Sequence, residues 1–135
     1  MISAHYLVCF GDTDQMGVVY YANYLRMFEF SRVVFMRDCG LPYSQVEAAG
    51  FALPVAEAHV RYLAPARFED RLTIDAALVD LGRASAEFHY RVRRGDRVIA
   101  TGMTRHACVD GGGRPTRIPD DLRRRLPVDG AGVFD

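Results

Sequence analysis

Phe10-Gly-Asp-Thr-Asp-Gln-Met-Gly-Val-Val-Tyr-Tyr-Ala-Asn-Tyr24 joins a predicted strand, residues 3–10, to a predicted long helix, residues 21–39. Two carboxylates, Asp12 and Asp14, lie two residues apart in the turn between these elements. The first turn of a helix carries unpaired backbone N–H groups and the positive end of the helix dipole. We therefore expect a carboxylate beside N–H groups that can hold a polarised carbonyl oxygen.

The predicted long helix is apolar on almost every side. Its apolar residues leave only a narrow charged edge of Arg26, Glu29 and Arg37, and Gly40 followed by Pro42 ends it. A helix that is apolar nearly all round is expected to be enclosed by the rest of the fold. We therefore expect a sheet wrapped around it.

The remainder of the chain is predicted to be mostly strands, because apolar and polar residues alternate between glycine- or proline-containing turns. The predicted strands cover residues 53–63, 72–78, 86–92 and 97–109, with short helices over residues 42–49 and 119–126. Residues 127–135 are expected to form a flexible tail. One strand, one helix and four consecutive antiparallel strands predict an α+β fold, with a five-stranded antiparallel sheet around one long helix. Its open sheet edge and uncovered face predict dimerisation.

Length and composition predict a single domain over residues 1–135, located in the cytoplasm. The chain has 135 residues and a formal net charge of zero, which argues against nucleic acid or an acidic membrane as a partner. No signal peptide and no stretch long enough to span a membrane is evident. The 3 cysteines are scattered without a CxxC pair, as expected in a reducing compartment. All 17 basic residues are arginine and most follow residue 60, which is compatible with a phosphate-bearing ligand in that half.

Three motifs follow one another along the chain: residues 10–24, Pro65-Ala-Arg-Phe-Glu-Asp-Arg-Leu72 and Ala107-Cys-Val-Asp110. In sequence and in order they resemble motifs of the hotdog-fold thioesterases. The branch resembled is that of 4-hydroxybenzoyl-CoA thioesterase and the tol–pal-associated acyl-CoA thioester hydrolases, and the resemblance covers residues 4–126. It implies a hotdog fold and hydrolysis of aromatic or short-to-medium acyl-CoA to the free acid and CoA. Coenzyme A is then part of the substrate, no separate cofactor is expected, and the chain is expected to form a homodimer or homotetramer.

The resemblance also implies the site residues. Asp14 matches the catalytic carboxylate, which either attacks the thioester carbonyl or activates a water. The backbone N–H of Tyr21 matches the oxyanion donor, although many relatives carry histidine there, so no imidazole role is expected. The predicted substrate-binding residues are Gly17, Tyr24 and Arg83. Gly17 permits an unusual backbone conformation or close ligand approach, and Tyr24 is either a core residue or a substrate contact. Arg83 is expected to meet the nucleotide phosphates of CoA. Relatives carry a run of basic residues at this position, whereas this chain has one arginine there.

No metal site is predicted. Asp12 is interpreted as a structural residue that caps the turn, and no histidine or glutamate lies near it in sequence to complete a metal shell with Asp14. The histidines have no HxxxH or HExxH spacing and are expected to lie on the surface or to be hydrogen-bonded in the core. They are His5, His59, His89 and His106.

Three alternative functions remain at this stage. The first is a thioesterase acting on acyl chains bound to a carrier protein, because the phosphopantetheine arm of a carrier is chemically that of CoA. The second is a non-catalytic hotdog domain that binds acyl-CoA, against which the presence of Asp14 counts. The third is a hydratase or dehydratase, which would pair a histidine with an acid, and no histidine accompanies Asp14.

Overall fold

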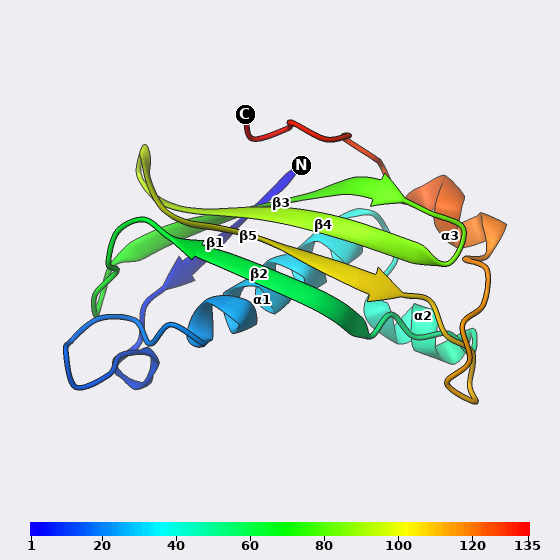
Figure 1. Cartoon of the computed structure of the whole chain (residues 1–135), viewed down its shortest axis with the longest axis horizontal. Coiled ribbons are helices and arrows are strands. Elements are labelled where there is room, and N and C mark those ends of the chain that lie inside the picture. Colours follow the sequence, from blue (N-terminus) through cyan, green and yellow to red (C-terminus); the bar gives the residue numbers. More distant parts are fainter.

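The computed structural model describes residues 1–135, which form one antiparallel sheet with a long helix across one of its faces (Figure 1). The sheet order is β1-β3-β4-β5-β2, so the first strand and the second strand lie at opposite edges. The strands are β1 (Ile2–Leu7), β2 (Val55–Tyr62), β3 (Arg71–Leu81), β4 (Ser85–Arg94) and β5 (Arg97–Ala107). The predicted five-stranded antiparallel sheet is thereby confirmed.

Helix α1 (Asn23–Asp38) packs its inner side against the concave face of the sheet, and the core lies between them. The ring of Phe28 stacks on that of Tyr90 with centroids 4.4 Å apart, and Phe35 meets Phe88 edge-on at 5.3 Å. Gly102 on β5 makes room for this packing, because a Cβ at that position would overlap the Phe28 ring. Core aromatic pairs of this kind hold the helix at a fixed height above the sheet.

The expectation of an enclosed helix is wrong in one respect. Leu25, Phe30 and Val33 lie on the side of α1 that faces away from the sheet, with exposed fractions of 42%, 38% and 45%. A single sheet covers only one side of a helix, so the opposite apolar side stays open in the isolated chain. The helix also begins at Asn23, two residues later than the sequence pattern predicts.

Strand β2 forms an open sheet edge. It pairs with β5 on one side only, and every residue of the strand except Val60 is exposed. The edge therefore presents unpaired backbone N–H and C=O groups along its whole length.

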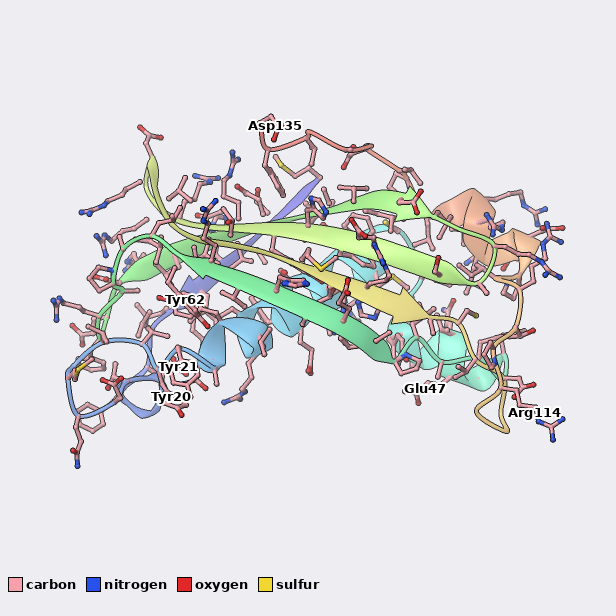
Figure 2. The ribbon with its side chains drawn as sticks, in the orientation of Figure 1. Tyr20, Tyr21, Glu47, Tyr62, Arg114 and Asp135 are labelled. Atoms are coloured by element: carbon pink, nitrogen blue, oxygen red, sulfur yellow. The ribbon has the colours of Figure 1, made fainter.

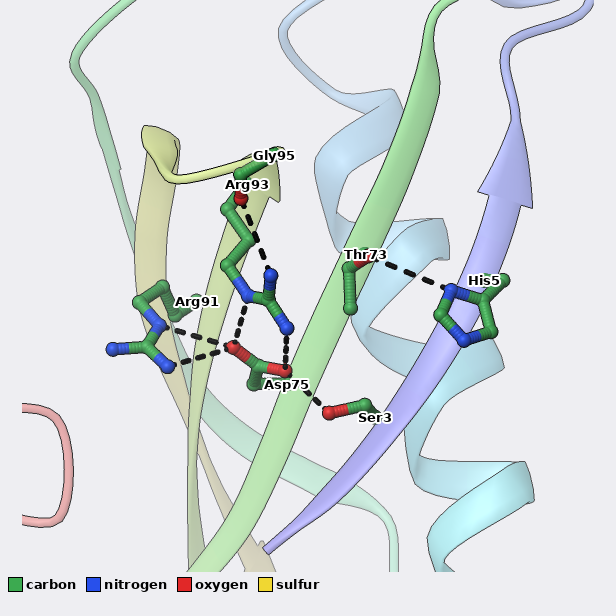
Figure 3. Close-up of polar contacts among 7 residues, drawn as sticks. All are labelled: Ser3, His5, Thr73, Asp75, Arg91, Arg93 and Gly95. Atoms are coloured by element: carbon green, nitrogen blue, oxygen red, sulfur yellow. Dashed lines mark hydrogen bonds and ion pairs between the residues drawn. The ribbon is translucent and has the colours of Figure 1, made fainter.

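The outer face of the sheet carries one buried charge, Asp75 on β3 (Figure 3). Its carboxylate accepts hydrogen bonds from Ser3 at 2.6 Å, from Arg91 at 2.9 and 3.0 Å, and from Arg93 at 2.9 Å. Burial alone would raise the pKa of Asp75, but the hydrogen bonds from Arg93, Ser3 and Arg91 lower it below its ordinary value. This cluster ties β1, β3 and β4 together.

The C-terminal segment runs along the face of the sheet opposite α1 (Figure 1). The Asp129 N–H donates to the carbonyl of Leu78 at 2.8 Å, and the Asp129 carboxylate pairs with the N-terminal ammonium of Met1 at 2.6 Å. The ring of Phe134 lies 4.8 Å from the guanidinium of Arg91. The flexibility of residues 127–135 stays a prediction.

Two short helices, α2 (Tyr43–Ala48) and α3 (Asp120–Arg125), lie at one end of the sheet. No helix in the structure has both the length and the apolar character that crossing a bilayer requires.

Candidate active site

A small hairpin carries Asp14 to the start of α1. The Asp14 N–H donates to the Val18 carbonyl at 2.9 Å, and the Tyr20 N–H donates to the Asp12 carbonyl at 2.9 Å. Gly17 closes the tip, donating its N–H to the Asp14 carbonyl at 2.9 Å with φ of +78°. Glycine reaches this left-handed conformation without the steric cost that a side chain would add. The hairpin therefore follows from local turn chemistry.

Asp12 anchors this hairpin, as the sequence predicts. Its buried carboxylate accepts hydrogen bonds from the Tyr6 hydroxyl and from the Cys9 N–H, both at 2.8 Å. Burial and the adjacent carboxylate raise the pKa of Tyr6 to about 12, so this hydroxyl stays a neutral donor. The Asp12 carbonyl also accepts from the Asn23 side chain at 2.9 Å, which fastens the hairpin to the first residue of α1.

Asp14 is held by one carboxylate oxygen and leaves the other without a partner. Its Oδ1 accepts the Met16 N–H at 2.9 Å, whereas Oδ2 accepts no hydrogen bond within the chain. The residue is half-buried. No other group in the chain lies within 4 Å of the position that a Cβ on Gly17 would take. Within the chain, the glycine is thus explained by its backbone conformation and not by a close contact.

Tyr21 lies in the turn just before α1. Its backbone N–H donates to no acceptor in the chain, and Ala22, which caps the helix, supplies no side-chain hydrogen bond. The Tyr21 carbonyl accepts a hydrogen bond of 2.9 Å from the Tyr62 hydroxyl, at the end of β2. Figure 2 shows Tyr20, Tyr21 and Tyr62 gathered at the same end of the molecule. A free N–H next to a helix start can donate a hydrogen bond to a developing oxyanion.

Of the two other predicted binding residues, the structure places Tyr24 in the core beside Tyr62 and only Arg83 far from this hairpin. Tyr24 is a core residue, 3% exposed, with its ring edge against Tyr62 at a centroid distance of 5.5 Å. Arg83 is exposed in the β3–β4 turn, whereas the hairpin contacts the loop before β3 through a bridge between Val18 and Arg67. At about 3.3 Å per residue, β3 separates these two ends by roughly 35 Å. One chain therefore does not bring Arg83 to Asp14.

Exposed apolar side chains surround the hairpin. Phe10 and Met16 are each 77% exposed, and the Phe10 ring meets Phe68 edge-on at 5.8 Å. The other members are Tyr20, Tyr21, Tyr62 and Leu63. Such a cluster beside polar groups is typical of a surface that binds a ligand or a second chain.

Two residues of this arrangement, Asn23 and Tyr62, carry structural roles that sequence reasoning did not assign. Tyr62 lies 41 residues from the carbonyl that it contacts, so no local pattern could have indicated the pairing. The sequence does contain Asn23 in the predicted start of the helix, where a side-chain amide often bonds backbone groups. The absence of a metal from this site stays a prediction.

The chain matches the family model described as the thioesterase-like superfamily over residues 8–126. A 1,4-dihydroxy-2-naphthoyl-CoA hydrolase from Thermosynechococcus vestitus is 36% identical over 124 residues, which cover 90% of this chain and 78% of the relative. The acyl-CoA thioesterase YbgC of Haemophilus influenzae is 28% identical over 118 residues, covering 86% and 87% of the two chains. The crystal structure of hypothetical protein TT1821 from Thermus thermophilus is 40% identical, with a TM-score of 0.89 and coverage of 92% and 95%.

Proposed function

Because the chain belongs to the thioesterase-like superfamily, we propose that it hydrolyses acyl-CoA thioesters to a free acid and CoA. Its five-stranded antiparallel sheet across one long helix is the hotdog fold. Relatives named as acyl-CoA thioesterase and as 1,4-dihydroxy-2-naphthoyl-CoA hydrolase support this reaction class. The hydrolase with an aromatic acyl group also favours an aromatic substrate over a purely aliphatic one.

The observation that carries the proposal is the combination of a free carboxylate oxygen in the short hairpin and a free N–H in the turn that follows it. Asp14 Oδ2 and the Tyr21 N–H both lack partners within the chain. In the proposed reaction the Tyr21 N–H donates to the thioester carbonyl oxygen and stabilises the negative charge that develops there. Asp14 either attacks the carbonyl carbon, expelling CoA thiolate and leaving an anhydride that water cleaves, or takes a proton from an attacking water.

We further propose a homodimer that pairs the β2 edges of two chains. The open β2 edge and the apolar side of α1 with Leu25, Phe30 and Val33 are two uncovered surfaces that such a dimer would bury. In a two-fold pair of antiparallel edge strands, the Val55 end of one strand lies next to the Tyr62 end of the other. Because β2 and β5 pair Val55 with His106, and β4 and β5 pair His106 with Ala86, the Val55 end is the Arg83 end of the sheet. This dimer would therefore bring the Arg83 end of one chain towards Asp14 of the other.

A panel of thioesters assayed by release of free thiol tests the proposed activity. The panel contains benzoyl-CoA, acetyl-CoA, octanoyl-CoA and the same acyl groups on a phosphopantetheinylated carrier protein. We expect turnover of CoA thioesters, with the benzoyl compound favoured. Turnover of the carrier-bound series alone would move the substrate class to carrier proteins, and binding without thiol release from any member would indicate a non-catalytic domain.

A further inference from the structure

The polar groups beneath the C-terminal half of α1 form a single hydrogen-bonded network. Arg32 Nη1 lies 3.1 Å from the Tyr90 hydroxyl, which lies 2.6 Å from Thr104 Oγ1. Thr104 Oγ1 in turn lies 2.8 Å from His106 Nε2, and His106 Nδ1 lies 2.9 Å from the carbonyl oxygen of Leu53. Tyr90, Thr104 and His106 are all at most 3% exposed. Four side chains from one helix and two strands are thus linked inside an otherwise apolar core.

The donor and the acceptor of every hydrogen bond in this network are determined. The Leu53 carbonyl can only accept, so His106 Nδ1 carries the hydrogen, and burial lowers the pKa of His106 to about 4 and keeps the ring neutral. Nε2 must therefore accept from the Thr104 hydroxyl, whose oxygen then accepts from Tyr90. The Tyr90 oxygen accepts from Arg32. Since each hydroxyl hydrogen is already used, Arg32 is the only member of the network with N–H groups left to donate.

A cavity of about 220 Å³ lies against this hydrogen-bonded network. Arg32 and His106 line it together with Tyr43, whose hydroxyl oxygen accepts the Leu53 N–H at 3.0 Å and whose own hydrogen has no acceptor in the chain. The apolar lining consists of Val33, Met36, Leu53 and Phe88. The cavity therefore combines apolar walls with two partly buried donors that have hydrogens without an acceptor in the chain, one donor being cationic.

Volume and chemistry define what such a cavity accepts. An apolar cavity of about 150 Å³ holds one benzene ring, and drug-sized ligands occupy roughly 300 Å³ or more. The size therefore suits one ring with one substituent. A guanidinium and a phenolic hydroxyl with hydrogens free to donate favour an oxygen-bearing and preferably anionic substituent.

We propose that this cavity binds a single-ring aromatic carboxylate, with the ring between Met36 and Phe88 and the carboxylate on Arg32 and Tyr43. Arg32 lies nine positions after Asn23, roughly 14 Å along the helix from its start, so the cavity is separate from the Asp14 hairpin of the same chain. Binding requires no catalysis and does not rest on the proposed function. The aromatic acid could reach the cavity as a free acid or as the acyl end of a bound thioester.

The negative charge of Glu29 opposes the binding of a carboxylate, and this gives the proposal a second test. Its carboxylate also lines the cavity, is exposed, and forms no ion pair with Arg32. Its repulsion of an anion is screened by water, whereas Arg32 is partly buried and fixed by Tyr90. Neutralising Glu29 should therefore strengthen the binding of a carboxylate.

Calorimetric titration with benzoate tests the proposal, and Arg32→Met is the diagnostic variant because it keeps most of the side-chain volume. We expect benzoate to bind the wild-type protein at least about tenfold more tightly than Arg32→Met, and Glu29→Gln to bind it more tightly than wild type. Arg37→Met is the matched control, since Arg37 is exposed on the same helix and does not line the cavity, and should match wild type. Benzamide, which has the same shape without the charge, should bind weakly. Equal affinity of Arg32→Met and wild type for benzoate would overturn the proposal.

A second measurement uses the wild-type protein and remains decisive if Arg32→Met does not fold. Bound benzoate should show nuclear Overhauser contacts from its ring protons to the Met36 methyl group, assigned with Met36→Leu, and none to the exposed Met16 methyl. The absence of Met36 contacts at saturating benzoate would also overturn the proposal. Competitive inhibition of thioester hydrolysis by benzoate would identify the acyl end of the substrate as the natural occupant, whereas non-competitive inhibition would identify the free acid. Benzoate binding by a protein without thioesterase activity would remove the proposed function and leave this site intact.

Discussion

The hydroxyl of Tyr62, the last residue of β2, donates a hydrogen bond of 2.9 Å to the carbonyl oxygen of Tyr21, just before α1. This contact ties the free end of the edge strand to the turn that carries the unpaired Tyr21 N–H. The Asn23 N–H makes a second tie, donating to the Tyr20 carbonyl at 2.9 Å. Both peptide groups that flank Tyr21 therefore have a hydrogen-bonded carbonyl oxygen. These two bonds fix the direction in which the Tyr21 N–H, the proposed oxyanion donor, points.

Replacing Tyr62 with phenylalanine should lower kcat severalfold on a good CoA thioester. The ring packing against Tyr24 is kept, but the turn loses one hydrogen bond, of a kind worth about 1 kcal/mol, and its N–H becomes less well oriented. Steady-state kinetics with a thermal melt checks this. The thermal melt is the control, because a fall in kcat without a fall in melting temperature assigns the effect to the orientation of the turn. Identical kcat values for Tyr62→Phe and wild type would show that the contact does not position the donor.

Asp14→Asn should reduce kcat by ~10²–10⁴-fold, because the amide keeps the size of the side chain but cannot act as base or nucleophile. KM for the CoA thioester should change little, since the lost charge acts mainly in the transition state. Asp12→Asn is the matched control two residues away. Its carboxylate bonds Tyr6 and Cys9, so this variant should lower the melting temperature more than kcat. Near wild-type kcat in Asp14→Asn would rule out the proposed chemistry and leave the N–H donor as the main contributor.

Arg83→Ala should raise KM for CoA thioesters by roughly 10- to 100-fold and leave short pantetheine thioesters nearly unaffected, if Arg83 contacts the nucleotide phosphates. In one chain Arg83 lies at the far end of the sheet from Asp14, so this result also requires a second chain. Equal loss on both substrate series would assign Arg83 a structural role.

Sedimentation at micromolar concentration should show a dimer or a tetramer. The β2 edge can be blocked with Val60→Pro, because proline removes one backbone N–H and disfavours strand addition. Val128→Pro, at an exposed position whose N–H makes no hydrogen bond in the chain, serves as a control for general effects of proline. A wild-type protein that sediments only at 15.1 kDa would contradict the proposed assembly.

The free energy of unfolding should fall as the pH decreases from about 6.5 to about 4. His106 is neutral in the folded chain, where burial lowers its pKa from 6.5 to about 4, so the unfolded chain binds more protons in this window. The contribution is fully present above pH 6.5 and lost towards pH 4, and it is on the order of 3 kcal/mol. Urea titrations across this range measure it, and His106→Gln should flatten the slope. The lowered pKa of Asp75 adds a separate loss below about pH 3.8. A wild-type stability that is constant between pH 4 and 6.5 would contradict the neutral buried ring.

Local sequence patterns determine the elements of this protein and the hairpin of its candidate site. Gly17 takes a left-handed φ, Gly40 takes another just after α1, and alternation of apolar residues specifies the inner faces of β3 and β4. Each of these depends on a few neighbouring residues, so the sequence is sufficient to predict it. Asp14 and Tyr21 lie within this local unit, which is why a motif of 15 residues can contain both.

Only the tertiary structure determines which distant residues contact one another. The partner of Tyr21 is 41 residues away, Arg32 meets Tyr90 across 58 residues, and Arg83 lies at the far end of the sheet from the hairpin. The same holds for the helix, because its pattern showed that it was apolar nearly all round but not that one side would stay open. These relationships depend on strand order and register, which the summed packing of distant segments selects and which no single stretch encodes.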